Sequence, residues 1–271
     1  MAQEHISKPL PTLFIPHGGG PCFFMDWNPP DAWNKMAVWL SGLGSSLGVA
    51  PKAMVVISGH WEEADFTVTS NPKPPLIYDY FGFPARTYQI KYDAPGSPAL
   101  AQRVQDLLEK AGIRSRSDGN RGFDHGVFIP LKVVYPKADI PIVQLSLKAG
   151  LDPEAHLAAG RALAPLRSEG ILVVGSGMSY HNMRGLMSGK ILPASDQFDA
   201  WLTAAVTAPE ATVRNRDLVH WDQAPAAREA HPQEEHLMPL MVAAGAAGDN
   251  PGKHIFADRV MGATVSAYQF G

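Results

Sequence analysis

The sequence predicts an α/β fold, in which helices cover a central, mostly parallel or mixed β-sheet. Short, continuously apolar runs rich in β-branched residues alternate with longer amphipathic runs along the 271 residues. A strand that is apolar on both sides has to be covered on both faces, as in a parallel sheet packed between helices. The length fits a single domain, assigned here to residues 1–271, and residues 1–10 are expected to form a flexible N-terminus.

Each element is expected from its own pattern, in chain order. Buried strands are expected at residues 12–17 (TLFIPH), 53–61 (AMVVISGHW), 141–147 (PIVQLSL) and 171–177 (ILVVGSG). Helices are expected at residues 31–48, 97–112, 153–170, 195–207 and about 232–246. The runs 254–260 and 263–270 alternate polar and apolar residues, as half-buried strands do. In a sheet of this kind, the functional site is expected at the carboxyl ends of the strands.

Residues typical of helix ends support three of these boundaries. Asp31 is a plausible N-cap for the first helix. Ser97, followed by Pro98, opens the second helix, and Gly112 closes it. His231 is expected at a cap position before Pro232, a good first helical residue.

The composition excludes several classes of function. The formal net charge of −3 gives no reason to expect a nucleic-acid partner. No apolar run is long enough for a membrane-spanning helix, and the N-terminus does not resemble a signal peptide. Cys22 is the only cysteine, so no intrachain disulfide is possible, and we expect a cytoplasmic location.

Histidines follow three of the predicted buried strands. His17 follows TLFIP, His60 follows AMVVISG, and His181 follows ILVVGSGMSY, while His125 lies in the loop GFDHG. A single histidine in such a place is usually structural, but three at strand ends would converge if the strands were neighbours. Neutral imidazole is the commonest protein ligand for zinc, iron and copper. The glycines after His17 permit a sharp turn and leave space beside such a metal.

The segment HPQEEH offers a further ligand. On a helix, His231 and His236 would point about 140° apart, so both could hardly bind one metal. His236 precedes an apolar run and is the better inward candidate. Glu234 or Glu235 would instead complete a site of two histidines and one carboxylate, and spacing does not choose between His236 and a glutamate.

A competing interpretation is an esterase, but the order of the predicted elements argues against it. HGGG resembles an oxyanion-hole loop, and GSSLG at residues 44–48 matches the G-x-S-x-G pattern of a nucleophile elbow. That motif needs a strand before the serine and a helix after it. Here the predicted order is reversed. P-loop and dinucleotide-binding fingerprints are absent.

Seven blocks, in the same order, resemble the class III extradiol ring-cleaving dioxygenases. The similarity is to the 4,5-DOPA dioxygenase branch, related to the catalytic subunit of protocatechuate 4,5-dioxygenase. It runs from about residue 11 to the C-terminus. The blocks are PHGGGP, ISGHWE, YDYFGFP with YDAPGSPALA, GFDHGVFIPLKVVYP, IPIVQLSL, GSGMSYHN and EEHLMPL.

The resemblance implies a single α/β domain with one mononuclear metal ion per chain. By position it implies that His17, His60 and His236 are metal ligands and that His181 is the acid–base residue. In some zinc-bound members the residue matching His181 is counted as a fourth ligand. His125 is expected to line the substrate pocket and donate a hydrogen bond. Many members have His-Gly-Ser where this chain has His-Gly-Gly, and in the wider family the third ligand can be a glutamate.

The implied reaction opens a catechol ring with O₂ on Fe(II), while Zn(II) is a possible bound species. We expect a catechol with a polar side chain, DOPA-like diols first, with Tyr180 and Arg184 as possible carboxylate partners. Aromatic residues of the IYDYFGFP loop could wall the pocket; they are Tyr78, Tyr80, Phe81 and Phe83. An oligomer is possible. The alternatives are a zinc-dependent hydrolase, weakened by the absence of HExxH, and a non-enzymatic binding module of the same fold.

Overall fold

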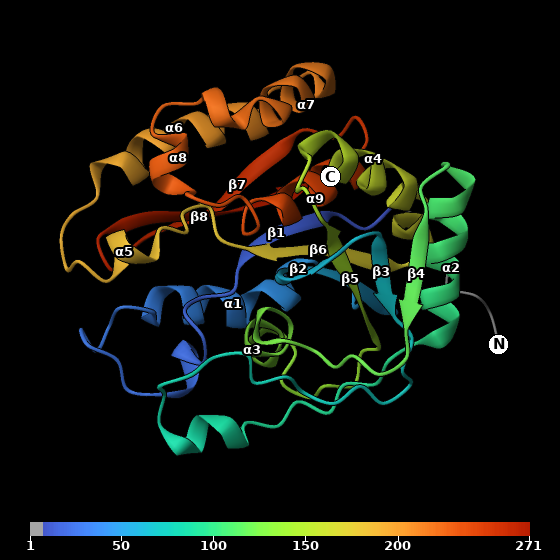
Figure 1. The fold of residues 1–271 in the computed structure, drawn as a ribbon, viewed down its shortest axis with the longest axis horizontal. Coiled ribbons are helices and arrows are strands. Elements are labelled where there is room, and N and C mark those ends of the chain that lie inside the picture. Colours follow the sequence, from blue (N-terminus) through green and yellow to red (C-terminus); the bar gives the residue numbers. More distant parts are fainter. Residues whose placement is uncertain (1–7) are drawn as a thin grey trace.

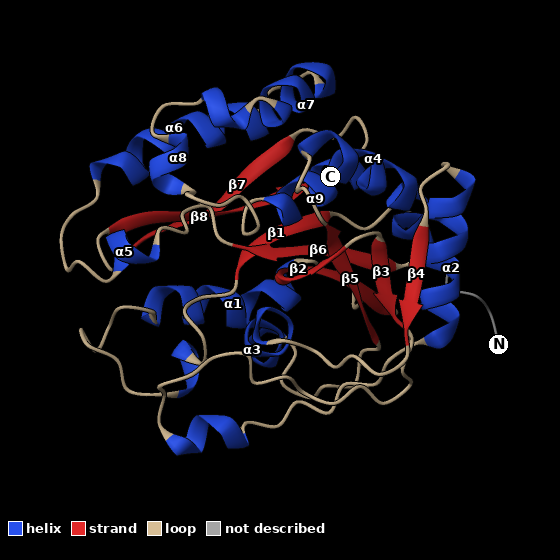
Figure 2. Cartoon of the chain, viewed as in Figure 1, coloured by secondary structure: helices blue, strands red, loops and turns tan. Residues whose placement is uncertain are grey.

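An eight-stranded mixed sheet lies at the centre of the molecule (Figure 2). The computed structural model describes residues 8–271. The strands lie in the order β4-β3-β5-β2-β6-β1-β8-β7. Their bounds are β1 Thr12–Pro16, β2 Ala53–Glu63, β3 Phe66–Thr69, β4 Ser115–Asp118, β5 Ile142–Lys148, β6 Ile171–Gly177, β7 Gly252–Val260 and β8 Ala263–Phe270.

Four adjacent strands, β5, β2, β6 and β1, run parallel, and the sheet is mixed only toward its edges. β2 pairs in parallel with both β5 and β6, and β6 pairs in parallel with β1. β8 is antiparallel to β1 and to β7, and β3 is antiparallel to β5. The predicted α/β fold is therefore confirmed. The strands that precede His17, His60 and His181 are neighbours, so their carboxyl ends meet at one edge of the sheet.

Helices cover both faces of the sheet (Figure 1). α4 and α9 lie on one face, and α1 and α3 lie on the other. The bounds are α1 Asn34–Ser46, α2 Pro98–Lys110, α3 His125–Val134, α4 Pro153–Leu163, α5 Met183–Leu186, α6 Pro193–Val206, α7 Ala211–Val219, α8 Ala227–Ala230 and α9 Met238–Ala246. Within residues 8–271, none of these helices combines the length and the apolar character needed to cross a bilayer.

The two-sided burial of β2 explains why its sequence is continuously apolar. Successive side chains of a strand point to opposite faces. Met54 and Val56 therefore belong to the core cluster on one side of the sheet, while Val55 and Ile57 belong to the cluster on the other side. All four are buried.

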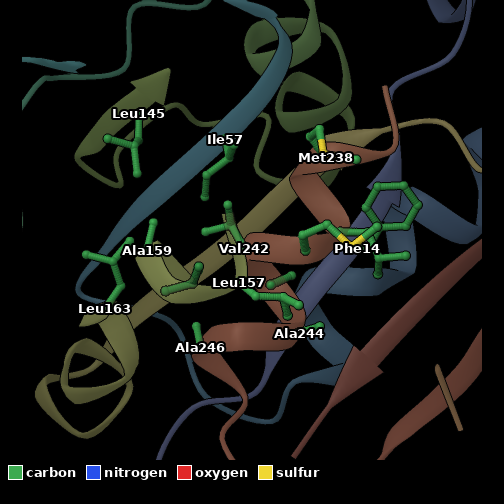
Figure 3. Packing of buried hydrophobic residues seen from close by; sticks show 14 of the residues in the cluster. Phe14, Ile57, Leu145, Leu157, Ala159, Leu163, Met238, Val242, Ala244 and Ala246 are labelled. Carbon is green, nitrogen blue, oxygen red and sulfur yellow. The ribbon is translucent and has the colours of Figure 1, made fainter. Parts of the chain in front are cut away.

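Helices α4 and α9 pack closely against each other over one face of the sheet. Figure 3 shows Leu157 and Val242 of these helices packed among strand residues that include Ile57. A Cβ on Gly160 would lie 2.2 Å from the Val242 carbonyl oxygen, and one on Gly245 would lie 2.2 Å from that of Leu157. The two glycines therefore allow backbone-to-backbone contact between the helices.

The structure confirms some of the predicted helix ends and contradicts others. Ser97 is confirmed as the N-cap of α2, because its side chain accepts a hydrogen bond from the Leu100 amide. Gly112 follows that helix with φ +73°, as a helix-ending glycine does. Asp31 as an N-cap was wrong. α1 begins at Asn34, with Trp33 in the cap position, and a turn precedes it.

Prolines shorten two of the expected helices. The helix expected at 153–170 stays α-helical only to Leu163 and continues as a 3₁₀ turn over Ala164–Glu169. The helix expected from about residue 232 begins only at Met238. Pro165 and Pro239 have no amide hydrogen to donate to the carbonyl four residues earlier, which explains both differences. The expected place of His231 before a helix beginning at Pro232 was wrong as well, because His231 is instead the C-cap residue of the short helix α8.

Two short strands were not predicted from the sequence. Strands β3 and β4 are only four residues long, and β4 is partly exposed, so neither has a strong apolar pattern. The expected flexible N-terminus falls mostly on residues outside those that the structure describes. Within the described part, Leu10 is buried, and its amide donates to the Arg167 carbonyl at 3.1 Å.

Candidate metal centre

Three histidines converge where β1 and β2 end and α9 begins. Single ring nitrogens of His17, His60 and His236 all lie within 4.8 Å of one another. His17 directly follows β1, and His60 lies near the end of β2, within the irregular stretch between Ile57 and Glu62 where the pairing with β5 shifts register. His236 comes from the turn before α9. Strand geometry thus places two of these imidazoles, and a loop from the far end of the chain places the third.

Backbone contacts fix His17 and His236 in this position. The His17 amide donates to the Gly177 carbonyl at 3.1 Å, and the Met178 amide donates to the His236 carbonyl at 3.0 Å. Both bonds tie these residues to the end of β6. A Cβ on Gly177 would lie 2.1 Å from the His236 carbonyl oxygen, so only glycine permits this approach.

The ring nitrogens are arranged as metal ligands require. Nδ1 of His17 lies 2.8 Å from the Gly18 carbonyl oxygen and donates to it in the tautomer that leaves Nε2 free. That Nε2 is buried and has no hydrogen-bond partner among residues 8–271. The Nε2 atoms of His60 and His236 are 3.2 Å apart. Two nitrogens bound to one tetrahedral zinc lie about 3.3 Å apart, so this pair fits a shared metal ion.

Burial keeps these imidazoles neutral. Burial is the largest cause that lowers the pKa of His17 and of His236 well below the usual value, and the neighbouring imidazoles lower it further. Burial and the nearby His125 lower the pKa of His60 to about 3, against the opposing effect of Asp79. Neutral imidazole presents the lone pair that a metal needs, so the three side chains are ready to bind one near neutral pH.

Two further histidines flank this cluster, each beside a carboxylate. The Asp79 carboxylate accepts hydrogen bonds at 2.9 Å from the His125 amide and from its Nδ1. Nδ1 of His181 lies 3.4 Å from Oε1 of Glu235, and Nδ1 of His236 lies 2.9 Å from the same oxygen. These contacts hold the rings through Nδ1 and leave the Nε2 atoms of His125 and His181 outside the contacts with the two carboxylates.

The carboxylates beside the histidines remain ionised. Burial raises the pKa of Asp79, but hydrogen bonds and charge from His125 outweigh it and hold the pKa below its usual value. Burial also raises the pKa of Glu235, but the hydrogen bond from His181 lowers it, and the net result is a pKa below the usual value. Glu234 instead accepts a hydrogen bond from Arg228 at 2.6 Å.

Asp79 is the site residue that the sequence analysis missed as a functional group. The available signal was a single acidic residue inside the aromatic run IYDYFGFP. Two further groups of potential ligands also arise, one of His60, Asp79 and His125, the other of His181, Glu235 and His236. His181 is absent from the all-histidine group, and His231 lies apart from it, with Nε2 on the Ser179 carbonyl at 3.0 Å.

A pocket of about 530 Å³ opens beside the cluster and includes His17, His60, His125 and His181 in its lining. Tyr80, Phe81 and Phe83 line it as expected. Tyr78 does not: its hydroxyl donates to the Ile90 carbonyl at 2.6 Å.

The expected carboxylate partners lie elsewhere. Tyr180 is buried in the core, and Arg184 is exposed and lines an adjoining pocket, which shares His181 and Met183 with the first.

The sheet, the histidine cluster and the adjoining pocket define an α/β protein with a histidine-rich candidate metal site beside a cavity that suits a small molecule. Residues 14–271 match the family of the catalytic LigB subunit of aromatic ring-opening dioxygenase, and the chain belongs to this family of extradiol ring-cleaving enzymes. The family resemblance seen in the sequence is thereby confirmed.

Individual relatives agree with this assignment. The chain is 43% identical over 242 residues to a 4,5-DOPA dioxygenase extradiol of Beta vulgaris, a match that covers 88% of this chain and 87% of the relative. It is 38% identical over 239 residues to the dioxygenase tasH of Hapsidospora irregularis, covering 82% and 72%. The crystal structure of an uncharacterized protein from Escherichia coli K12 superposes with a TM-score of 0.77 at 32% identity, covering 97% of this chain and all of the other.

Proposed function

We propose that the protein is an Fe(II)-dependent dioxygenase that opens a catechol ring next to the diol, with His17, His60 and His236 holding the metal. The observation that supports this most directly is the buried, unpartnered Nε2 of His17 beside the paired Nε2 atoms of His60 and His236. A set of three neutral nitrogen ligands leaves open positions on a metal. Iron bound there would bring the diol oxygens and O₂ together and let electrons pass between them.

His181 is proposed to move the substrate proton. The Glu235 carboxylate beside Nδ1 favours the tautomer with the proton on that nitrogen, so Nε2 carries a lone pair. A neutral imidazole facing the pocket can accept a proton from a catechol hydroxyl and later return it. Glu235 also contacts the Nδ1 of His236, so one carboxylate orients a proposed ligand and the proposed base.

His125 is proposed to hold the bound reactants by a hydrogen bond. Asp79 fixes its ring through two contacts to the same residue, the amide and Nδ1. When His125 is protonated, its Nε2–H can donate into the pocket, and the ionised Asp79 balances the charge. A role for His181 as a fourth ligand receives less support, because its nitrogens lie outside the all-histidine group.

The names of the relatives support a catechol as the substrate. The relative from Beta vulgaris, for example, is named a 4,5-DOPA dioxygenase. The lone thiol of Cys22, which is buried and unpaired, fits the cytoplasmic location that we include in the proposal.

Oxygen consumption with a catechol tests the proposal. The protein is loaded anaerobically with Fe(II), and O₂ uptake and ring-opened product are followed after air is admitted. We expect equimolar uptake with iron and none with zinc, because zinc has no redox chemistry. A hydrolase would act with zinc and without O₂. A binding module would bind the catechol and consume nothing. Either result would reject the dioxygenase.

A further inference from the structure

We infer that the catechol carries an uncharged, apolar substituent, which the pocket beside the histidine cluster receives. The inference rests on the proposed function and goes further by naming the substrate class. A volume of about 530 Å³ falls within the range of roughly 300–1,000 Å³ that is typical of pockets for drug-sized ligands. A bare catechol is much smaller than such ligands. The residues that would surround the extra part of the substrate decide its chemistry.

One wall of the pocket is aromatic. Trp27 lies edge-on to Trp33, with ring centroids 5.7 Å apart, and is stacked near Phe83 at 6.2 Å. These rings line the pocket together with Phe81. Gly20 lies against Phe83, and a Cβ there would come within 2.9 Å of that ring. Trp27, Trp33 and Phe83 therefore present flat, apolar faces held by their mutual contacts, whereas Phe81 is 91% exposed.

A second part of the lining, called here the methionine wall, consists mainly of methionines. Met178, Met183, Met187 and Met261 line the pocket. Met183 is 50% exposed and Met187 is 69% exposed, so large apolar side chains stand at the mouth. Exposed apolar groups gathered around a cavity are typical of ligand-binding surfaces. Methionine side chains are flexible and polarisable, so this wall can adapt to apolar groups of different shape.

The charge of the lining argues against a carboxylate. Among the described residues that line this pocket, Asp79 is the only Asp, Glu, Lys or Arg, and it lies at the histidine end. A substrate carboxylate between the two apolar walls would be desolvated without a counter-ion, which is costly. Arg184, once expected to serve this purpose, lines a different pocket that also borders His181 and contains Glu235.

Binding to zinc-loaded protein measures the preference without turnover. A series of 4-methyl-, 4-ethyl- and 4-propylcatechol is compared with 3,4-dihydroxyphenylpropionate and DOPA by calorimetry. We expect affinity to rise about fourfold for each methylene that is buried. We expect the carboxylated catechols to bind at least about tenfold more weakly than propylcatechol. With the Fe(II) enzyme, the same order should appear in kcat/KM.

Matched substitutions test whether the residues that line this pocket cause the preference for apolar catechols. Met187→Gln keeps the length of the side chain and should flatten the rise along the series, while Met187→Lys should improve carboxylate binding. Ile191→Gln is the control, since Ile191 is 70% exposed in the same segment but does not line the pocket. An equal effect of Ile191→Gln, a flat series in the unaltered protein, or tighter binding of the carboxylates would overturn the inference.

Two results separate this inference from the proposed function. Preferential binding of alkylcatechols without O₂ uptake by the iron enzyme would reject the dioxygenase and leave the pocket assignment standing. Rapid cleavage of DOPA with weak cleavage of propylcatechol would support the dioxygenase and reject the apolar substituent. If Arg184→Gln then abolished DOPA binding, the substituent would lie in the second pocket.

Discussion

The imidazole rings of His181 and His236 are stacked, with centroids 3.3 Å apart and planes inclined by 17°. Oε1 of Glu235 contacts the Nδ1 atoms of both rings. Stacking and a shared carboxylate fix the position of His181 relative to His236. In the proposed enzyme, the base is thereby held beside a metal ligand without being one of the three ligands itself.

Replacing Glu235 should affect both the proposed metal ligand His236 and the proposed base His181. In Glu235→Gln, the amide keeps the size of the side chain but loses its charge, so both rings lose their tautomer preference. We expect metal affinity to fall about tenfold to a hundredfold, as for other partners of metal ligands. Competition with a chelating dye measures that affinity. Glu234→Gln, next in the chain but paired with Arg228, is the control and should retain near-normal affinity.

Alanine substitutions should distinguish the ligands from the base. His17→Ala removes a ligand and should leave protein that no longer retains stoichiometric metal after dialysis, as measured by elemental analysis. His181→Ala should retain metal and lower kcat by roughly a hundredfold or more, the usual scale of general acid–base catalysis. His220→Ala removes an exposed histidine and should change neither property. Complete loss of metal from His181→Ala would instead make His181 a ligand.

Much of the proposed site follows from strand patterns alone. β1, β2 and β6 are continuously apolar, so their ends, and with them His17, His60 and the approach to His181, could be placed from sequence. Their adjacency could not be derived, because strand order depends on packing between distant segments. Asp79 could not be identified from the sequence for a similar reason. It lies 46 residues before His125 and reaches it only through the fold.

The segment before α9 shows a different limit of sequence reasoning. Pro232 suits the first turn of a helix, yet the backbone remains non-helical until Met238. The next proline, Pro239, was the overriding signal, because a helix begun at Pro232 would have required its missing amide hydrogen. The separation of His231 from His236 was predicted correctly, but the helical geometry used to argue it is absent.

Gly18 should be required for both conformation and space. Its φ of +84° disfavours any other residue, and a Cβ would lie 2.4 Å from Sγ of the buried Cys22. Gly48 also has positive φ, at +71°, but nothing lies within 4 Å of its Cβ position. Gly48→Ala should therefore cost about 1 kcal/mol from backbone strain alone.

Gly18→Ala should cost clearly more, since the contact with Cys22 adds to the strain. Urea unfolding of the metal-free proteins measures both free energies. Adding Cys22→Ala should recover part of the loss in Gly18→Ala and none in Gly48→Ala. Equal losses for the two glycine variants would show that the turn tolerates the side chain.

His156, which belongs to none of the groups of potential metal ligands, should make the stability of the protein depend on pH. Its side chain is fully buried, its Nδ1 lies 2.7 Å from the Asp152 carbonyl oxygen, and its Nε2 accepts from the Lys148 amide at 3.1 Å. Burial lowers its pKa from 6.5 to about 4, only partly offset by the Asp152 carbonyl. The unfolded chain therefore binds a proton more readily than the folded one, and protonation of the folded protein would also break the bond from Lys148.

The stabilisation from neutral His156 is fully present above the unfolded pKa of about 6.5 and is lost as the pH falls toward the folded pKa. Between about pH 7 and pH 4.5, this one group should reduce the free energy of unfolding by about 2 kcal/mol. His156→Gln cannot titrate and should be less stable at pH 7. Because His156→Gln does not lose this stabilisation at low pH, the difference in unfolding free energy between the unaltered protein and the variant, both metal-free, should shrink by about 2 kcal/mol on acidification. Urea unfolding at several pH values measures the gap, with His220→Gln as an exposed control. Parallel curves for the unaltered protein and His156→Gln would mean that His156 does not carry this pH dependence.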